Sequence, residues 1–155
     1  MYKLLLAFLF CLSFAASLGL QCEDFERQAK GCPKIYRPVC AIQKQTGNFS
    51  QVKQGFANKC EACSQSETQF VIPGNCEDYP KAAVFCNPAQ KKNHGCIEIY
   101  QAVCGVMFSN ENFMCDSKYC AQTYENYCYA CQDSAVGYYI QGECQEIDFE
   151  DNENY

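Results

Sequence analysis

The chain has 155 residues, 15 of them cysteine, and a formal net charge of -6. Cysteine at this density is typical of a scaffold held together by disulfides, and the acidic charge argues against a basic nucleic-acid-binding protein. The chain has one histidine, His94, so a Ser/His/Asp or Cys/His enzyme would have to be built around that residue. We therefore do not expect an enzyme.

The first residues have the layout of a secretory signal peptide. Lys3 precedes an apolar run over 4–14, and small residues follow over 15–19. A transmembrane anchor normally needs about 20 continuous apolar residues, which this interrupted run does not supply. The sequence predicts a signal peptide over 1–19 and a secreted, extracellular product with no membrane association once it is removed. Cys11 leaves with the signal, so an even number of cysteines remains, as complete disulfide pairing requires.

Most of the remaining cysteines form two sets with the same spacing. Successive offsets are 10, 8, 20, 3 and 13 residues in the first set and 10, 8, 24, 3 and 13 in the second. The agreement predicts two copies of one unit, over 22–76 and 86–144, with a linker over 77–85 and an acidic tail over 145–155. Units of this size have a marginal hydrophobic core and need disulfides. The sets are Cys22, Cys32, Cys40, Cys60, Cys63 and Cys76, then Cys86, Cys96, Cys104, Cys128, Cys131 and Cys144.

Two cysteines stand outside the repeat, and each copy is expected to contain the same short elements. Cys115 and Cys120 lie in the segment with the extra residues, and we expect them to pair locally. The segment between the second and third cysteines is expected to form an extended, exposed loop. A helix of two to three turns is predicted to begin at Asn58 and at Asn126. Short strands are predicted over 70–72 and 138–140, each followed by a turn at Gly74 or Gly142.

Three sequence segments recur around these cysteines. They are a seven-residue loop between two cysteines with Tyr and Val in common, an aromatic-x-Asn-x-Cys-x-x-Cys segment, and a closing Gly-x-Cys. The first copy contains Cys32 to Cys40 with Tyr36 and Pro38-Val39, then Phe56 to Cys63, then Gly74 to Cys76. The second contains Cys96 to Cys104 with Tyr100, then Tyr124 to Cys131, then Gly142 to Cys144. Together these segments resemble Kazal-type modules, the domains of many secreted serine-protease inhibitors. The fold class implied is small and disulfide-rich, with two Kazal-like modules that each have a short helix, a small β-sheet and an exposed loop.

The resemblance also implies a disulfide pairing. In the family, the first cysteine pairs with the fifth, the second with the fourth, and the third with the sixth. Carried over to this chain, the pairs are Cys22–Cys63, Cys32–Cys60, Cys40–Cys76, Cys86–Cys131, Cys96–Cys128 and Cys104–Cys144.

Kazal inhibitors present a substrate-like loop, and the resemblance places its reactive bond at Lys34-Ile35 and at Glu98-Ile99. Lys34 would enter the anionic specificity pocket of a trypsin-like protease. Glu98 suits an enzyme that prefers acidic residues, or its copy is inactive. The first copy carries seven Lys/Arg against five Asp/Glu, and the second three against six, so a shared target is not expected. The residues that would support the loops are Tyr36, Pro38, Asn58, Tyr100 and Asn126.

Three functional classes remain open. The leading expectation is an inhibitor whose partner is an extracellular, trypsin-like serine protease. The alternative is a non-inhibitory, follistatin-like protein-binding module. A metal or redox role for the two Cys-x-x-Cys pairs is disfavoured by the signal peptide, the repeat and the even cysteine count, so no metal and no cofactor is expected.

Two further features bear on these expectations. Asn48 begins an Asn-Phe-Ser sequence, which is either an N-glycosylation site or an unmodified turn. The segment between the third and fourth cysteines has 19 residues in the first copy and 23 in the second, longer than is usual for the family.

Overall fold

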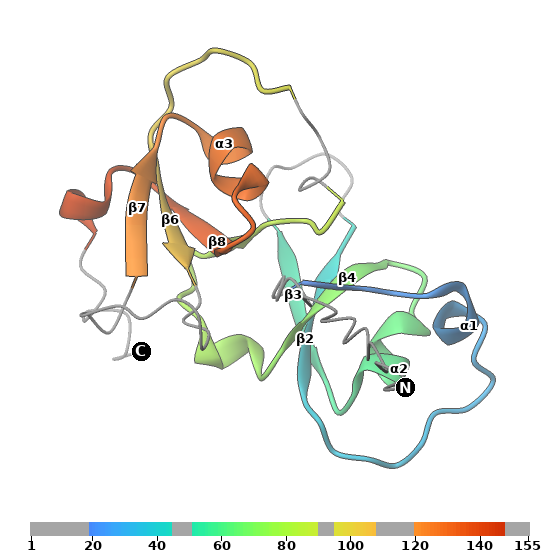
Figure 1. Ribbon diagram of the computed structural model, residues 1–155. Helices are drawn as coiled ribbons and strands as arrows, with labels where there is room; N and C mark the ends of the chain where they lie inside the picture. The colour runs from blue at the N-terminus through green and yellow to red at the C-terminus, as the bar shows by residue number, and fades with distance from the viewer. Residues whose placement is uncertain (1–18, 45–50, 90–94, 108–119, 148–155) are drawn as a thin grey trace, which may run out of the picture.

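The computed structural model describes residues 19–44, 51–89, 95–107 and 120–147. Figure 1 shows two small sheets, each with a short helix beside it. Both sheets have four antiparallel strands in the same order, with the first strand in sequence at one edge, then the fourth, the second and the third. The register shift between the second and fourth strands also falls at the equivalent place, at Ile42/Gln43 and at Val106/Met107. The repeat of cysteine spacing is thus matched by a repeat of topology.

The first unit contains the strands that surround the central β2. This strand is apolar and is buried over its first four residues, because both of its faces are covered: Val39 and Ala41 pack in a cluster with α2, and Cys40 and Ile42 pack in a second cluster. Helix α2 begins after Asn58 and packs against β4, β2 and β3. The elements are β1 (Leu20–Gln21), α1 (Asp24–Arg27), β2 (Val39–Gln43), β3 (Val52–Phe56), α2 (Lys59–Cys63), β4 (Thr68–Pro73) and the 3₁₀ turn η1 (Cys76–Asp78).

The second unit repeats the arrangement without a counterpart of α1 among the described residues. Its helix α3 begins after Asn126 and packs against β8, β6 and β7. The elements are β5 (Val84–Phe85), β6 (Val103–Met107), β7 (Cys120–Tyr124), α3 (Tyr127–Gln132), β8 (Val136–Gln141) and the 3₁₀ turn η3 (Cys144–Glu146).

Six disulfides join described cysteines, three in each unit. They are Cys22–Cys63, Cys32–Cys60, Cys40–Cys76, Cys86–Cys131, Cys96–Cys128 and Cys104–Cys144, the same pairs that the family resemblance implies. Cys120 is also disulfide-bonded, and its expected partner Cys115 lies outside the described residues. The chain is therefore a small disulfide-rich protein with short helices and small antiparallel sheets.

The structure differs from the sequence-based expectations in the length of two elements and in the linker. Helices α2 and α3 have five and six residues, shorter than the expected two to three turns. The predicted strands over 70–72 and 138–140 lie inside the longer strands β4 and β8. The predicted linker ends in β5, which pairs with β8 and so belongs to the second sheet.

Several expectations concern residues outside the described ranges. These are the signal peptide through residue 18, the glycosylation sequence at Asn48, His94, Cys115 and most of the acidic tail. Where the structure is described, no helix is long and apolar enough to cross a membrane.

Candidate functional site

The candidate site consists of two exposed loops, one in each unit. The first loop (residues 33–38) and the second loop (residues 97–102) have no regular secondary structure. Each loop begins after a cysteine that is bonded to the helix of its unit, Cys32 to Cys60 in α2 and Cys96 to Cys128 in α3. Each loop ends where the central strand of its sheet, β2 or β6, begins. Disulfides therefore hold both ends of each loop, because the central strand is cross-linked in turn at Cys40 or Cys104.

The side-chain amide of Asn58 lies beneath the first loop. Its Nδ2 donates to the carbonyl oxygen of Pro33 at 3.2 Å and to that of Ile35 at 3.1 Å. These two carbonyls lie on either side of the Lys34-Ile35 peptide bond. One amide group thus fixes the backbone both before and after the bond that the family resemblance implies as reactive.

The same amide also begins helix α2. Asn58 has extended backbone angles, and its Oδ1 accepts a hydrogen bond from the N–H of Glu61 at 3.0 Å. This is the geometry of a helix N-cap, which satisfies a backbone donor that the helix itself leaves unpaired. Asn58 is only 7% exposed, so both halves of its amide are bonded in a buried place.

Asn126 repeats this arrangement in the second unit. Its Nδ2 donates to the carbonyls of Ile97 at 3.1 Å and Ile99 at 3.0 Å, on either side of Glu98. Its Oδ1 accepts from the N–H groups of Cys128 and Tyr129 at the start of α3. At 3% exposure, Asn126 is as buried as its counterpart.

Backbone hydrogen bonds attach the far end of each loop to the sheet. In the first loop, the N–H of Arg37 donates to the Ala57 carbonyl at 2.8 Å, and the Pro38 carbonyl accepts from the N–H of Gly74 at 2.9 Å. Gly74 has a φ of +91°, a conformation that residues other than glycine rarely adopt. The predicted turn at Gly74 therefore also places the Gly74 N–H where it can donate to the loop carbonyl of Pro38.

The second loop has the equivalent backbone attachments. The N–H of Gln101 donates to the Glu125 carbonyl at 2.7 Å, and the Ala102 carbonyl accepts from the N–H of Gly142 at 3.0 Å. Gly142 also has a positive φ, of 106°. Sequence reasoning missed these attachments because backbone groups have no residue-type signal. The only sequence signal for these attachments was the glycine that lies two residues before the last cysteine of each unit, Gly74 or Gly142.

The residues between these attachments point into solvent. Lys34, Ile35 and Arg37 are exposed in the first loop, as are Glu98 and Ile99 in the second. Each unit thus presents one charged side chain at the equivalent position, cationic in the first and anionic in the second.

The two tyrosines predicted to support the loops are also exposed. Tyr36 is 76% exposed, and Tyr100 is 69% exposed with its hydroxyl donating to Glu143 Oε1 at 2.9 Å. Tyr100 therefore ties the second loop to the turn before Cys144, whereas the Tyr36 side chain mainly faces solvent.

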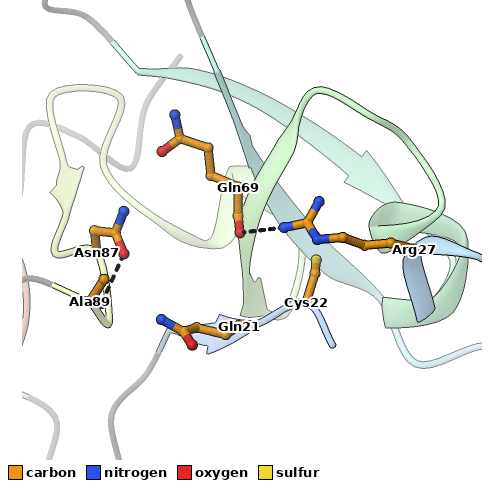
Figure 2. Close-up of a pocket in the computed structure, with 6 residues that line it drawn as sticks. All are labelled: Gln21, Cys22, Arg27, Gln69, Asn87 and Ala89. Atoms are coloured by element: carbon orange, nitrogen blue, oxygen red, sulfur yellow. Dashed lines mark hydrogen bonds between the residues drawn. The ribbon is translucent and has the colours of Figure 1, made fainter. Parts of the chain in front are cut away.

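A separate surface hollow of 390 Å³ lies near the edge strand β1. Figure 2 shows Arg27 reaching across it to the backbone carbonyl of Gln69, at 3.3 Å. The other described residues that line it are Gln21, Cys22, Asn87 and Ala89, and none of the described lining residues carries a carboxylate or an imidazole. The hydrogen bond from Arg27 links α1 to β4. The described lining residues contain no acid–base pair for proton transfer.

The two Cys-x-x-Cys pairs are the sequence motifs that could suggest a metal or redox centre. All four of their cysteines are engaged in disulfides to Cys22, Cys32, Cys86 and Cys96. Among the described residues, no group of three His, Cys, Asp or Glu side chains is placed to hold a metal ion.

Comparison with known proteins assigns no relative. No protein family, curated protein or solved structure matches the chain.

Proposed function

We propose that the chain is a secreted serine-protease inhibitor of Kazal-like type, whose first loop presents the Lys34-Ile35 bond to a trypsin-like enzyme. The observation that carries this proposal is the Asn58 amide, which holds the carbonyls on both sides of that bond. A loop already fixed in an extended form loses little conformational entropy on docking. The exposed Lys34 side chain supplies the cation for an anionic specificity pocket.

If the protease hydrolyses the Lys34-Ile35 bond, the two new chain ends stay attached to the same unit, which favours inhibition over digestion. The new carboxyl group of Lys34 stays on the segment joined to Cys32, and the new amino group of Ile35 stays on the segment that enters β2 at Cys40. Disulfides attach both segments to the same small unit. Because the two new ends remain close together, resealing competes with release of product.

The second loop has the same backbone supports but carries Glu98 where the first has Lys34. A carboxylate does not pair with the acidic pocket of a trypsin-like enzyme. The second loop is therefore assigned to a serine protease that accepts an acidic residue, and trypsin inhibition to the first loop alone.

The proposed location is extracellular. Disulfides persist in oxidising compartments such as the secretory route and are rare in the reducing cytosol. A small protein with six disulfides among its described residues fits that route.

Substitution of Lys34 tests this assignment. Lys34→Ala removes the charge that would be buried in the protease pocket, and losses of about 2 to 5 kcal/mol are typical for such a charge. We expect the inhibition constant for trypsin to rise by about 30-fold or more. Lys44→Ala is the matched control, because Lys44 is an exposed lysine of the same unit outside the loop.

Two outcomes oppose the assignment. If Lys34→Ala inhibits trypsin as strongly as the unaltered protein, the reactive bond lies elsewhere. If the unaltered protein leaves trypsin fully active, the non-inhibitory protein-binding module replaces the inhibitor as the better account.

A further inference from the structure

One hydrophobic cluster runs from the first sheet through the linker into the second sheet. Phe85 of β5 is 1% exposed, and its ring makes edge contacts with Tyr79 at 5.0 Å and with Tyr138 at 5.7 Å between centroids. The two units therefore share a core. The buried members are Cys40, Ile42, Phe70 and Ile72 from the first unit, Ala83 from the linker, and Phe85, Val106, Tyr138 and Ile140 from the second unit.

Gln51 of the first unit closes the free edge of β5. The N–H of Cys86 donates to the Gly137 carbonyl, so the backbone groups of the preceding residue, Phe85, point away from β8. The Gln51 side chain bonds both of them, with Nε2 donating to the Phe85 carbonyl and Oε1 accepting from its N–H, each at 2.8 Å. The carboxamide acts here as a neighbouring strand would.

Lys53 makes a second contact from the same side of β3. Its Nζ donates to the Lys81 carbonyl at 3.1 Å and lies 5.3 Å from the centroid of the Phe85 ring. A cation over an aromatic face is attractive. Gln51 directly precedes β3 and Lys53 is its second residue, so the two are alternate residues of an extended segment and share a face.

Both residues come from the segment between the third and fourth cysteines, which is longer than is usual for Kazal-like modules. The extra length forms the hairpin of β2 and β3, whose second strand reaches the linker. Figure 1 shows the two loops at opposite ends of the molecule, the first below β2 and the second above β6.

We propose that Gln51 and Lys53 dock the first unit on the linker and β5 and make the two units one rigid body, so that the first and second loops are held at a fixed separation and orientation. The rigid body rests on the contacts of Gln51 and Lys53 with Phe85 and Lys81 and on the shared core around Phe85, and it holds whether or not the loops inhibit a protease. The lengthened hairpin, which departs from the family resemblance, thus has a role of its own.

The rigid body is tested without any protease. Nuclear spin relaxation of backbone amides is expected to give one tumbling time for both units of the mature protein. The variant Gln51→Ala/Lys53→Ala is expected to give separate, shorter times, and hydrogen exchange at the Phe85 amide is expected to accelerate by about tenfold or more. Gln54→Ala is the control, because Gln54 lies on the same strand but bonds Gln43 on the exposed surface. Separate tumbling in the unaltered protein, or no change in the double variant, overturns the docking role.

Discussion

At the level of single residues, the loops depend most on one asparagine in each unit. Asn58 and Asn126 each use the amide oxygen to begin a helix and the amide nitrogen to hold two loop carbonyls. No other common side chain of this length offers both an acceptor and two donors. The sequence predicted these residues as helix starts, and the family resemblance implied their contact with the loop backbone.

Asn58→Asp separates the two roles of this side chain. Aspartate caps helices as well as asparagine does, so helix α2 is expected to form, although burying a carboxylate against two carbonyl oxygens is expected to lower the melting temperature. It has no donor for the Pro33 and Ile35 carbonyls, so the loop loses two hydrogen bonds. Trypsin is expected to cleave Lys34-Ile35 about tenfold faster or more, as measured by mass spectrometry after reduction.

Asn126→Asp serves as the control for this change, because it loosens only the second loop. Its rate of cleavage at Lys34-Ile35 is expected to match that of the unaltered protein. A rate for Asn58→Asp equal to that of the control would show that the amide does not protect the bond.

Gly74 is a second position where a single residue type is required. An added Cβ would stand 2.9 Å from Asp78 Oδ2, and the φ of +91° is strained for any other residue. Gly74→Ala is expected to cost about 1 to 2 kcal/mol and to lower the melting temperature. Gly55→Ala, in a strand with no atom within 4 Å of the added Cβ, is expected to leave it unchanged or slightly raised. Equal melting temperatures for the two variants would contradict this account.

At the level of secondary structure, the predictions succeeded where a cysteine or a cap fixed the position. The starts of α2 and α3 and the cores of β4 and β8 were predicted from Asn58, Asn126 and the apolar residues before each turn. The other six strands of the described residues, β1, β2, β3, β5, β6 and β7, were not predicted, and two residues are too few for β1 or β5 to show an alternating pattern. Both helices are short: α2 ends at its second cysteine, Cys63, and α3 ends one residue after its second cysteine, Cys131.

One contact ties β7 to the end of α3 and makes stability depend on pH. The hydroxyl of Tyr124 donates to Asp133 Oδ2 at 2.7 Å. Burial, together with this hydrogen bond and the charge of Asp133, raises the pKa of Tyr124 well above its ordinary value of 10.0. The folded protein therefore keeps this proton at a pH where the unfolded chain loses it, so the stabilisation is present below about pH 10 and lost above it.

Chemical denaturation on either side of that pH tests this contact. The free energy of unfolding is expected to fall between about pH 9 and about pH 11, and to fall less in Tyr124→Phe. Tyr36→Phe, at an exposed tyrosine, is expected to behave as the unaltered protein does. An equal fall in Tyr124→Phe would exclude this tyrosine as a source of the pH dependence.

At the level of the whole molecule, each of the two small units is held by three disulfides between described cysteines, and the units share a core. The sequence predicted two copies from the cysteine spacing. It did not predict their contact, because that contact depends on a glutamine, a lysine and a two-residue strand that have no recognisable pattern. The shared core adds burial that a unit of this size lacks when alone.

Incubation of the mature protein with an equimolar amount of trypsin tests the central claim most directly. Residual trypsin activity and the state of the Lys34-Ile35 bond are followed together over time. The account predicts that activity is lost at one equivalent and stays lost, while a substantial fraction of the bond remains intact. Full trypsin activity from the outset, or complete cleavage of the bond with recovery of activity, would contradict it.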